Sequence, residues 1–384
     1  KAVNKWLPRG LEMFGDERGG GSNVRAGLKP MKNAEAQEQY YQEVEKLLRD
    51  VDKRFVRARI PSLGLAEADG VVERILDGET VEGITRDDLL VAPDSRFFRR
   101  RGVPAFELTG VSGERLEDAL DVVARLNGEG SMATVDVLGE SVADRAKATA
   151  AVDEYIRIFD AIERRGLDSN VSIKLTLLGL AIDETFCRDN VLAIAEAAAA
   201  HGNFVRIDME DHPTHDATFR IYHHVHQRLG NVGVVLQAYM RRALADVDAL
   251  PEAGASVRLC KGIYVEPRQV AWKGYDTVRQ NFLALLEKML ERGVYAAVAT
   301  HDEFLVAGAI RLLHRFRVPR DRYEFQMLLG VEEELRRILT GRGHRMRIYV
   351  PYGRDWYPYS VRRMRENPQV ATHVVKAIVA RRGL

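Results

Sequence analysis

The segments VSIKLT (171–176) and FVRIDM (204–209) share one pattern: apolar residues alternate with a lysine, an arginine or an aspartate. In the strands of an α/β barrel, successive side chains point alternately toward the surrounding helices and into the barrel. Ile173 and Leu175 would therefore face the helices, and Lys174 would face the interior. The pattern predicts strands that have helices packed on one side and polar side chains on the other.

Runs of this kind recur from about residue 106 onward, roughly 30 residues apart, which is the length of one β/α unit. Helical patterns separate most of them, most clearly at 151–166 and 275–293. Eight such units predict an α/β fold of the (β/α)8 barrel type, since the alternative, a doubly wound sheet, usually has fewer strands. The six further runs are MATVDVLG (132–139), VGVVLQAY (232–239), SVRLCKG (256–262), YAAVATH (295–301), YEFQML (323–328) and MRIYVP (346–351).

Composition is that of an ordinary globular enzyme: 384 residues, 46% hydrophobic and 29% charged, with a formal net charge of +1. Such a balance gives no reason to expect nucleic acid as a partner. The chain has 2 cysteines, Cys187 and Cys260, which form no metal or redox motif, and this favours a cytoplasmic protein. No apolar run approaches the ~18 residues that would indicate a membrane span.

Residues 1–105 lack the strand and helix alternation, so we expect an N-terminal segment (1–105) followed by a barrel domain (106–384). Within the segment, 15–23 is glycine-rich and 35–56 has the periodicity of an amphipathic helix. It contains no catalytic motif.

The polar residues of five predicted strands would converge at the carboxyl ends of the barrel strands, where barrel enzymes have their active sites. These residues are Asp136, Lys174, Asp208, Arg258 and Tyr349. Lys174 and Asp208 come from neighbouring strands and could form an ion pair. One such residue could belong to a structural salt bridge, but five at five strand ends favour a functional site.

The segment YVPYGRDWYPYSVRRMREN (349–367) follows the last predicted strand and joins aromatic rings to a pair of arginines. Adjacent helical residues point about 100° apart, so Arg362 and Arg363 can reach one cavity, and Glu366 is close enough to hold either guanidinium. Two guanidinium groups beside an apolar pocket suit a small carboxylate.

Histidine clusters at 211–215 and 222–226 invite a metal-site interpretation, but no regular ligand spacing joins them to carboxylates. We therefore predict no metal. The glycine-rich 15–23 segment lacks the lysine of a phosphate-binding loop, and no dinucleotide-binding glycine motif follows a strand.

From about residue 106 to the end, the sequence resembles the proline dehydrogenase family. The motifs that carry the resemblance, in the family's order, are VDVLGE, VSIKLT, RIDMED, VVLQAYMRR, RLCKGIYVEP, ATHDE, EFQMLLGV and YVPYGRDWYPYSVRRMREN. The resemblance implies a distorted (β/α)8 barrel that holds FAD. It also implies oxidation of L-proline to Δ1-pyrroline-5-carboxylate by hydride transfer from proline C5 to flavin N5.

The resemblance assigns roles position by position. Lys174 matches the active-site lysine, Asp208 the aspartate near it, and Arg258 the arginine beside flavin N5, and these three form the predicted catalytic set. Predicted contacts with FAD are Met209, Gln237, Arg258, Lys261, Gly262, Ile263, Thr300 and His301. Predicted contacts with proline are Lys174, Tyr349, Leu328, Arg362, Arg363 and Glu366.

Two departures from the family pattern stand out. Ile263 occupies a position that is usually alanine, beside the flavin ring. Residues 1–105 do not match the family's helical arm and instead resemble the C-terminal part of the oxygenase component of benzoyl-CoA epoxidase. No di-iron chemistry transfers with that likeness, because residues 1–200 contain no histidine.

Two other functions compete with this one. A barrel lyase or aldolase could use Lys174 as a Schiff-base lysine. Alternatively, the N-terminal segment could make a non-catalytic assembly by blocking the barrel. The family usually passes its electrons to a quinone at the membrane, so we expect a quinone or other electron acceptor and peripheral membrane association as further features.

Overall fold

A computed structural model describes residues 111–354 continuously, together with residues 56, 60, 62, 64–76 and 79–84. It divides the chain into two compact units, Lys1–Ala105 and Phe106–Leu384.

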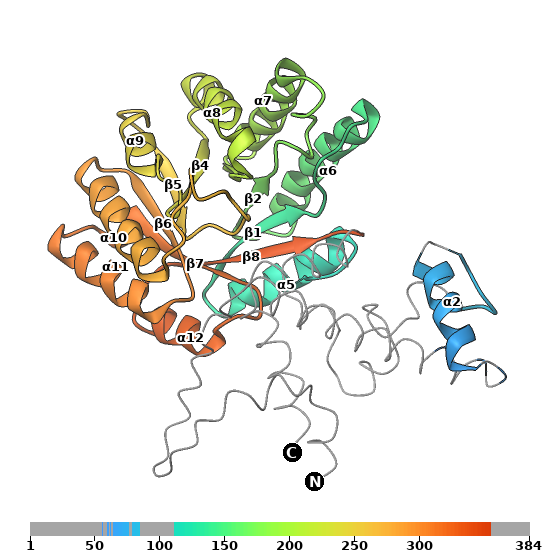
Figure 1. Ribbon diagram of the computed structural model, residues 1–384. Helices are drawn as coiled ribbons and strands as arrows, with labels where there is room; N and C mark the ends of the chain where they lie inside the picture. The colour runs from blue at the N-terminus through green and yellow to red at the C-terminus, as the bar shows by residue number, and fades with distance from the viewer. Residues whose placement is uncertain are drawn as a thin grey trace, which may run out of the picture. The chain divides into compact units, whose positions relative to one another are not determined.

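Eight parallel strands of the second unit form a closed barrel in chain order, with β8 paired to β1 (Figure 1). This confirms the (β/α)8 prediction and excludes the open doubly wound sheet. All eight predicted runs contain a strand. The strands are β1 (Met132–Val137), β2 (Ser169–Ile173), β3 (Val205–Ile207), β4 (Val232–Gln237), β5 (Ser256–Cys260), β6 (Tyr295–Ala299), β7 (Tyr323–Leu328) and β8 (Met346–Tyr352).

Helices follow the strands and form the outer layer (Figure 1). Aspartates begin three of them: Asp144, Asp183 and Asp302 each accept a hydrogen bond from a backbone N–H of the first turn of α6, α7 and α11. The helices are α5 (Leu116–Gly128), α6 (Arg145–Arg164), α7 (Glu184–Ala200), α8 (His215–Leu229), α9 (Ala243–Asp248), α10 (Tyr275–Glu291), α11 (Glu303–Arg315) and α12 (Glu333–Gly341). Short 3₁₀ turns are η4 (His212–Thr214) and η5 (Arg320–Arg322).

Helix α5 precedes the first strand and packs against both β8 and β1, where the barrel closes. Just before it, Ser112 donates hydrogen bonds from its backbone N–H and its hydroxyl to the carbonyl oxygen of Pro351. Gly353 donates its N–H to the carbonyl of Gly113. The chain entering the barrel is thus tied to the end of β8 before α5 begins.

The two faces of the strands differ as the alternation predicts. Ile173, Val205 and Ile207 are fully buried in the apolar layer between strands and helices. The interior instead holds buried polar residues that hydrogen-bond to one another across the barrel.

Arg206 belongs to this interior but does not reach the mouth. Its guanidinium donates to the carbonyls of Val234 and Ser256, at 2.9 and 2.6 Å, near the beginning of β4 and β5. Gly233 lies opposite Arg206 in the pairing of β3 with β4. A Cβ atom on Gly233 would come within 2.3 Å of the Arg206 guanidinium, so the missing side chain makes room for it.

The described part of the first unit contains α2 (Leu65–Leu76) and a tight turn that pairs Val81 with Ile84. Ala68, Val72 and Ile75 of α2 form a small core with Val56 and Ile84. The predicted helix at 35–56 lies almost entirely outside the described residues.

None of the helices in the described ranges is both long and apolar enough to cross a membrane.

Candidate active site

Four polar side chains meet at the carboxyl ends of the strands. Lys174 Nζ lies 2.7 Å from each carboxylate oxygen of Asp136 and 3.2 Å from the Tyr349 hydroxyl. The Tyr349 hydroxyl donates in turn to Asp208 Oδ2 at 3.1 Å. Residues from β1, β8 and the segments that follow β2 and β3 are thereby joined in one cluster.

Arg258 on β5 completes the cluster with three hydrogen bonds. Its guanidinium donates to Asp208 Oδ1 at 2.5 Å, to the Ser172 hydroxyl at 2.8 Å and to Gln326 Oε1 at 2.6 Å. Its charge also lies 5.3 Å from the centre of the Tyr349 ring. The five residues that the sequence placed at strand ends therefore do come together.

The predicted pairing of Lys174 with Asp208 is secondary. Lys174 Nζ is 3.8 Å from Asp208 Oδ2, whereas its contact with Asp136 is more than 1 Å shorter. Asp208 is held mainly by Arg258, so the cluster consists of two ion pairs that Tyr349 connects.

Burial governs the electrostatics of Asp136, whose side chain is fully buried. Burial raises its pKa, while the adjacent Lys174 charge opposes that rise. Formal charges in the cluster cancel, because two carboxylates face one lysine and one arginine.

The predicted cofactor positions at β3 and β4 form a second part of the mouth. Gln237 Nε2 donates to the carbonyls of Met209 and Glu210, at 3.1 and 2.8 Å. Its Oε1 atom is buried and has no hydrogen-bond partner among the described residues. A buried acceptor without a donor is costly, and a ligand with an N–H group would satisfy it.

Lys261 belongs to a charged group at the ends of β5 and β6. It contacts Asp302, which also accepts two 2.8 Å hydrogen bonds from Arg279 and one from the Tyr275 hydroxyl. Burial works against ionisation of Asp302, yet the Arg279 hydrogen bond and the Lys261 charge together lower its pKa to about 2.

The backbone position of Gly262 accepts only a residue without a side chain. Its φ is +107°, and a Cβ atom there would meet the Tyr239 ring at 2.3 Å. The next residue, Ile263, is 41% exposed and Val265 is 89% exposed. The loop after β5 thus carries solvent-exposed apolar side chains.

Thr300 and His301 follow β6 and organise the neighbouring strand ends. The Thr300 hydroxyl accepts the N–H of Asp302 at 3.1 Å, and His301 Nε2 accepts the N–H of Leu328 at 2.9 Å. His301 Nε2 therefore carries no proton in this arrangement. Arg362, Arg363 and Glu366 lie outside the described residues, so their predicted roles remain predictions.

Comparison with known proteins identifies the relatives of this chain. The family model described as proline dehydrogenase matches residues 119–376. Proline dehydrogenase 1 of Bacillus subtilis subsp. natto is 38% identical over 269 residues, which cover 70% of this chain and 89% of the relative. Proline dehydrogenase of Deinococcus radiodurans is 36% identical over 274 residues, covering 70% and 88%.

The chain belongs to the proline dehydrogenase family.

Among solved structures, proline utilization A from Bdellovibrio bacteriovorus, inactivated by N-propargylglycine, superposes with a TM-score of 0.67 at 21% identity. That alignment covers 86% of this chain and 37% of the other chain, so this chain corresponds to a minor part of the larger protein. At this identity the likeness shows the fold.

Sequence reasoning missed two partners of the cluster and one buried carboxylate near it. Ser172 and Gln326 hold Arg258, and Glu210 accepts hydrogen bonds from the Thr176 N–H and hydroxyl. Burial raises the pKa of Glu210. Serine and glutamine are uncharged, so neither stands out as a functional residue in a strand sequence. The alternation does place both on the inward face, because Ser172 is two residues before Lys174 and Gln326 is two residues before Leu328.

Two histidines of the 211–215 cluster lie against carboxylates. His212 pairs with the buried Glu266 at 2.5 Å, and His215 lies 3.0 Å from Asp246. Across the described ranges, no group of three or more potential ligands is placed to bind a metal ion.

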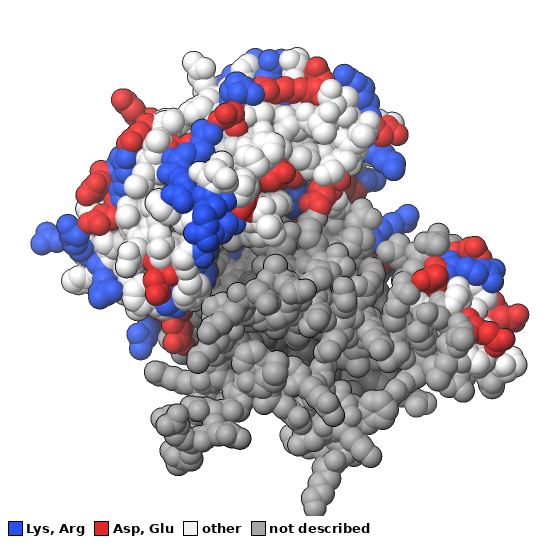
Figure 2. All heavy atoms as spheres, viewed as in Figure 1, with Lys and Arg blue, Asp and Glu red and all other residues white. Residues whose placement is uncertain are grey.

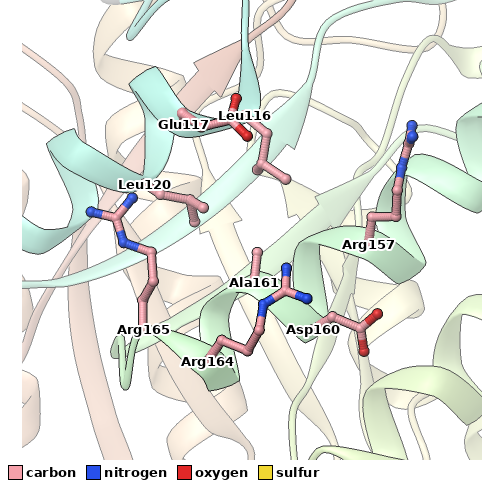
Figure 3. Close-up of a pocket in the computed structure, with 8 residues that line it drawn as sticks. All are labelled: Leu116, Glu117, Leu120, Arg157, Asp160, Ala161, Arg164 and Arg165. Carbon is pink, nitrogen blue, oxygen red and sulfur yellow. The ribbon is translucent and has the colours of Figure 1, made fainter.

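One hollow lies outside the barrel, between α5 and α6 (Figure 3). Its lining contains none of the predicted site residues. It consists of Leu116, Glu117, Leu120, Arg157, Asp160, Ala161, Arg164 and Arg165.

Proposed function

We propose that the cluster of Asp136, Lys174, Asp208, Arg258 and Tyr349 is the active centre of an FAD-dependent proline dehydrogenase. The reaction is the oxidation of L-proline to Δ1-pyrroline-5-carboxylate, the first step of proline catabolism. The observation that carries the proposal is the convergence of these residues at the barrel mouth of a chain in this family.

The chain's own residues fit FAD. Gln237 offers a buried acceptor without a donor, and the oxidised isoalloxazine ring has one N–H group. Lys261 and Arg279 offer positive charge for phosphates, and the exposed Ile263 offers apolar surface for a ring. Met209, Gly262, Thr300 and His301 complete the proposed set around the ends of β3, β5 and β6.

When bound, FAD accepts the two electrons and the hydrogen that leave proline C5. Arg258 is fixed at the mouth by three hydrogen bonds, so its charge is available to stabilise electron density arriving nearby without moving. Lys174, Tyr349 and Leu328 would border the proline ring.

The proline carboxylate would be held by Arg362 and Arg363, with Glu366 orienting their side chains. Since the charges of the described cluster cancel, these two arginines would supply the excess of positive charge that matches the carboxylate. An excess of positive charge also favours the neutral form of the substrate amine, which must lose its proton before the imine forms.

The direct test is the visible absorbance of the FAD-loaded protein before and after anaerobic addition of L-proline. Bleaching of the flavin bands is expected, and Arg258→Met should slow it. An FAD-loaded protein that proline does not bleach would rule out the proposed reaction.

The competing lyase function needs Lys174 as a free amine. Lys174 is instead hydrogen-bonded to both oxygens of a buried carboxylate, a contact that a carbonyl substrate would have to displace before reaching the amine. Borohydride trapping with carbonyl compounds should therefore leave Lys174 unmodified.

A quinone is the proposed electron acceptor, reached by peripheral association of a cytoplasmic protein with the membrane. Figure 2 shows Lys and Arg side chains gathered near the region where Figure 1 draws β5 and β6. The loop after β5 adds the highly exposed Val265 beside Arg268 and Lys273. Flotation with anionic vesicles that contain a quinone would test this association.

Residues 1–105 are proposed to take no part in the chemistry. They contain no histidine and no catalytic motif. The benzoyl-CoA epoxidase likeness of this segment stays a sequence-based prediction.

A further inference from the structure

A hydrogen-bonded path leads from Arg258 down into the barrel through Gln326. Gln326 Oε1 accepts the Arg258 Nε–H at 2.6 Å, and Gln326 Nε2 donates to Glu324 Oε1 at 2.6 Å. Gln326 is 5% exposed and Glu324 is 2% exposed, so neither has bulk water as an alternative partner. Gln326 is thus the only link seen in the described residues between Arg258 and Glu324.

The two neighbours fix the orientation of the Gln326 amide. Arg258 can only donate, and an ionised Glu324 can only accept. Rotating the amide by 180° would place its NH₂ against the guanidinium and its oxygen against the carboxylate, so both hydrogen bonds would be lost. The amide therefore has one orientation that satisfies both charged partners.

Glu324 is itself held by several hydrogen bonds. Its carboxylate accepts Arg347 Nε at 2.9 Å and the Tyr295 hydroxyl at 3.0 Å, and Arg347 donates to the carbonyl of Ala133 at 2.6 Å. Burial opposes its ionisation, but the Arg347 charge and the hydrogen bonds from Arg347 and Gln326 lower its pKa. The lower end of the path is a rigid ion pair that spans β7, β8 and β1.

We propose that Gln326 is a positioning residue that acts on the reaction through Arg258. It couples the Arg258 guanidinium to the rigid Glu324–Arg347 pair, so that Arg258 keeps one rotamer as Asp208 or the bound molecules change around it. The inference rests on the proposed function, since it assigns Arg258 a role in catalysis.

The first test is Gln326→Met, which keeps the length of the side chain and removes both hydrogen bonds. We expect kcat for proline to fall roughly 10- to 150-fold, the range for one hydrogen bond to a charged group. KM for proline should change much less, because the substrate carboxylate is proposed to bind to other arginines.

A double-mutant cycle with Arg258→Met separates positioning from general damage to the barrel. If Gln326 acts through Arg258, Gln326→Met should have little further effect on kcat in the Arg258→Met background. Equal fold-losses in both backgrounds, or an unchanged kcat in folded Gln326→Met, would overturn the proposal.

Thr134→Val is the matched control. Thr134 is 1% exposed in β1, and its hydroxyl has no hydrogen-bond partner among the described residues. The substitution therefore alters a buried polar position without touching Arg258, and kcat should stay at the wild-type value. A loss as large as that of Gln326→Met would point to nonspecific damage and refute the positioning role.

Gln326→Glu provides the conservative comparison and carries the test if Gln326→Met does not fold. It keeps an acceptor for Arg258, and one proton shared between two adjacent carboxyl groups can replace the lost donor. We expect its kcat to lie well above that of Gln326→Met or, without that variant, close to that of wild type. A kcat as low as that of Arg258→Met would contradict the proposal.

A readout independent of turnover is the dissociation constant of FAD, measured by quenching of flavin fluorescence. Gln326→Met should weaken FAD binding when Arg258 is intact. In protein that already carries Arg258→Met, it should leave FAD binding unchanged. If wild-type protein binds FAD but proline does not bleach it, the proposed reaction fails, while the coupling of Gln326 to Arg258 is still decided by this binding cycle.

Discussion

Asp136 is a fully buried carboxylate whose one cationic partner in the described structure is Lys174. Lys174→Met would leave that charge without compensation, which typically costs about 3–5 kcal/mol. A carboxyl whose pKa is raised by folding stabilises the protein at low pH and loses that contribution as the pH rises through the folded pKa. Lys174→Met should therefore be most destabilised at neutral pH and less so at acidic pH.

Urea unfolding of wild type and Lys174→Met at pH 5 and pH 8 would measure this difference. Adding Asp136→Asn should recover most of the lost stability, because it removes the uncompensated charge. Equal destabilisation at both pH values, without recovery in the double variant, would show that the ion pair does not control stability.

Arg363 is predicted to hold the substrate carboxylate together with Arg362. A charge-assisted hydrogen bond of this kind contributes about 1.5–3 kcal/mol, so Arg363→Met should weaken proline binding roughly 10- to 150-fold. Arg363→Lys should restore proline affinity only in part, because lysine has a point charge and lacks the paired N–H donors of a guanidinium. Titrating flavin bleaching with proline measures the affinity, and unchanged values in both Arg362→Met and Arg363→Met would disprove the assignment.

Alternation within a strand predicts which side chains point inward but not how deep they lie. Arg206 and Asp208 both face the interior, yet Arg206 reaches the beginning of β4 and β5 and Asp208 reaches the mouth. The space left by Gly233 and the pairing of β3 with β4 decide this difference. For the same reason the sequence could not show that Asp136, and not Asp208, is the closer partner of Lys174.

At the scale of elements, the strands were predictable because each has an uninterrupted apolar face, whereas their ends were not. The run VSIKLT suggested a strand that includes Lys174, but β2 covers Ser169–Ile173 and Lys174 lies just beyond it. Leaving the ladder frees Lys174 to turn toward Asp136 on β1. Gln326 stayed unnoticed because an uncharged inward residue in a strand gives no signal until Arg258 and Glu324 are seen on either side of it.

The loop after β5 depends on the unusual backbone of Gly262. Gly262→Ala would combine a φ of +107° with a clash against the Tyr239 ring. Strain of this kind costs about 1–3 kcal/mol, so FAD should bind roughly 5- to 150-fold more weakly while the barrel stays folded. Fluorescence titration with FAD measures the affinity.

Gly293→Ala is the control for Gly262→Ala, because it has a φ of +68° and nothing within 4 Å of the added Cβ. It follows α10 at the opposite end of the barrel from the mouth, so it should lower the unfolding temperature slightly and leave FAD affinity unchanged. Equal losses of FAD affinity in the two variants would show that the effect does not arise at the mouth.

At the scale of the whole molecule, the barrel contains every described residue of the proposed active site. The family match begins at residue 119, and the chain is tied to β8 from Ser112 onward. Deleting residues 1–105 should therefore leave a protein that folds, binds FAD and is bleached by proline at close to the wild-type rate. A folded, FAD-loaded deletion variant that proline no longer bleaches would show that the N-terminal segment takes part in the chemistry.

A deletion that ends at residue 113 should instead damage the barrel, because it removes the hydrogen bonds of Ser112 and Gly113 to Pro351 and Gly353. Comparing the two deletions by FAD content and thermal unfolding separates the barrel's own entry segment from the chain that precedes it.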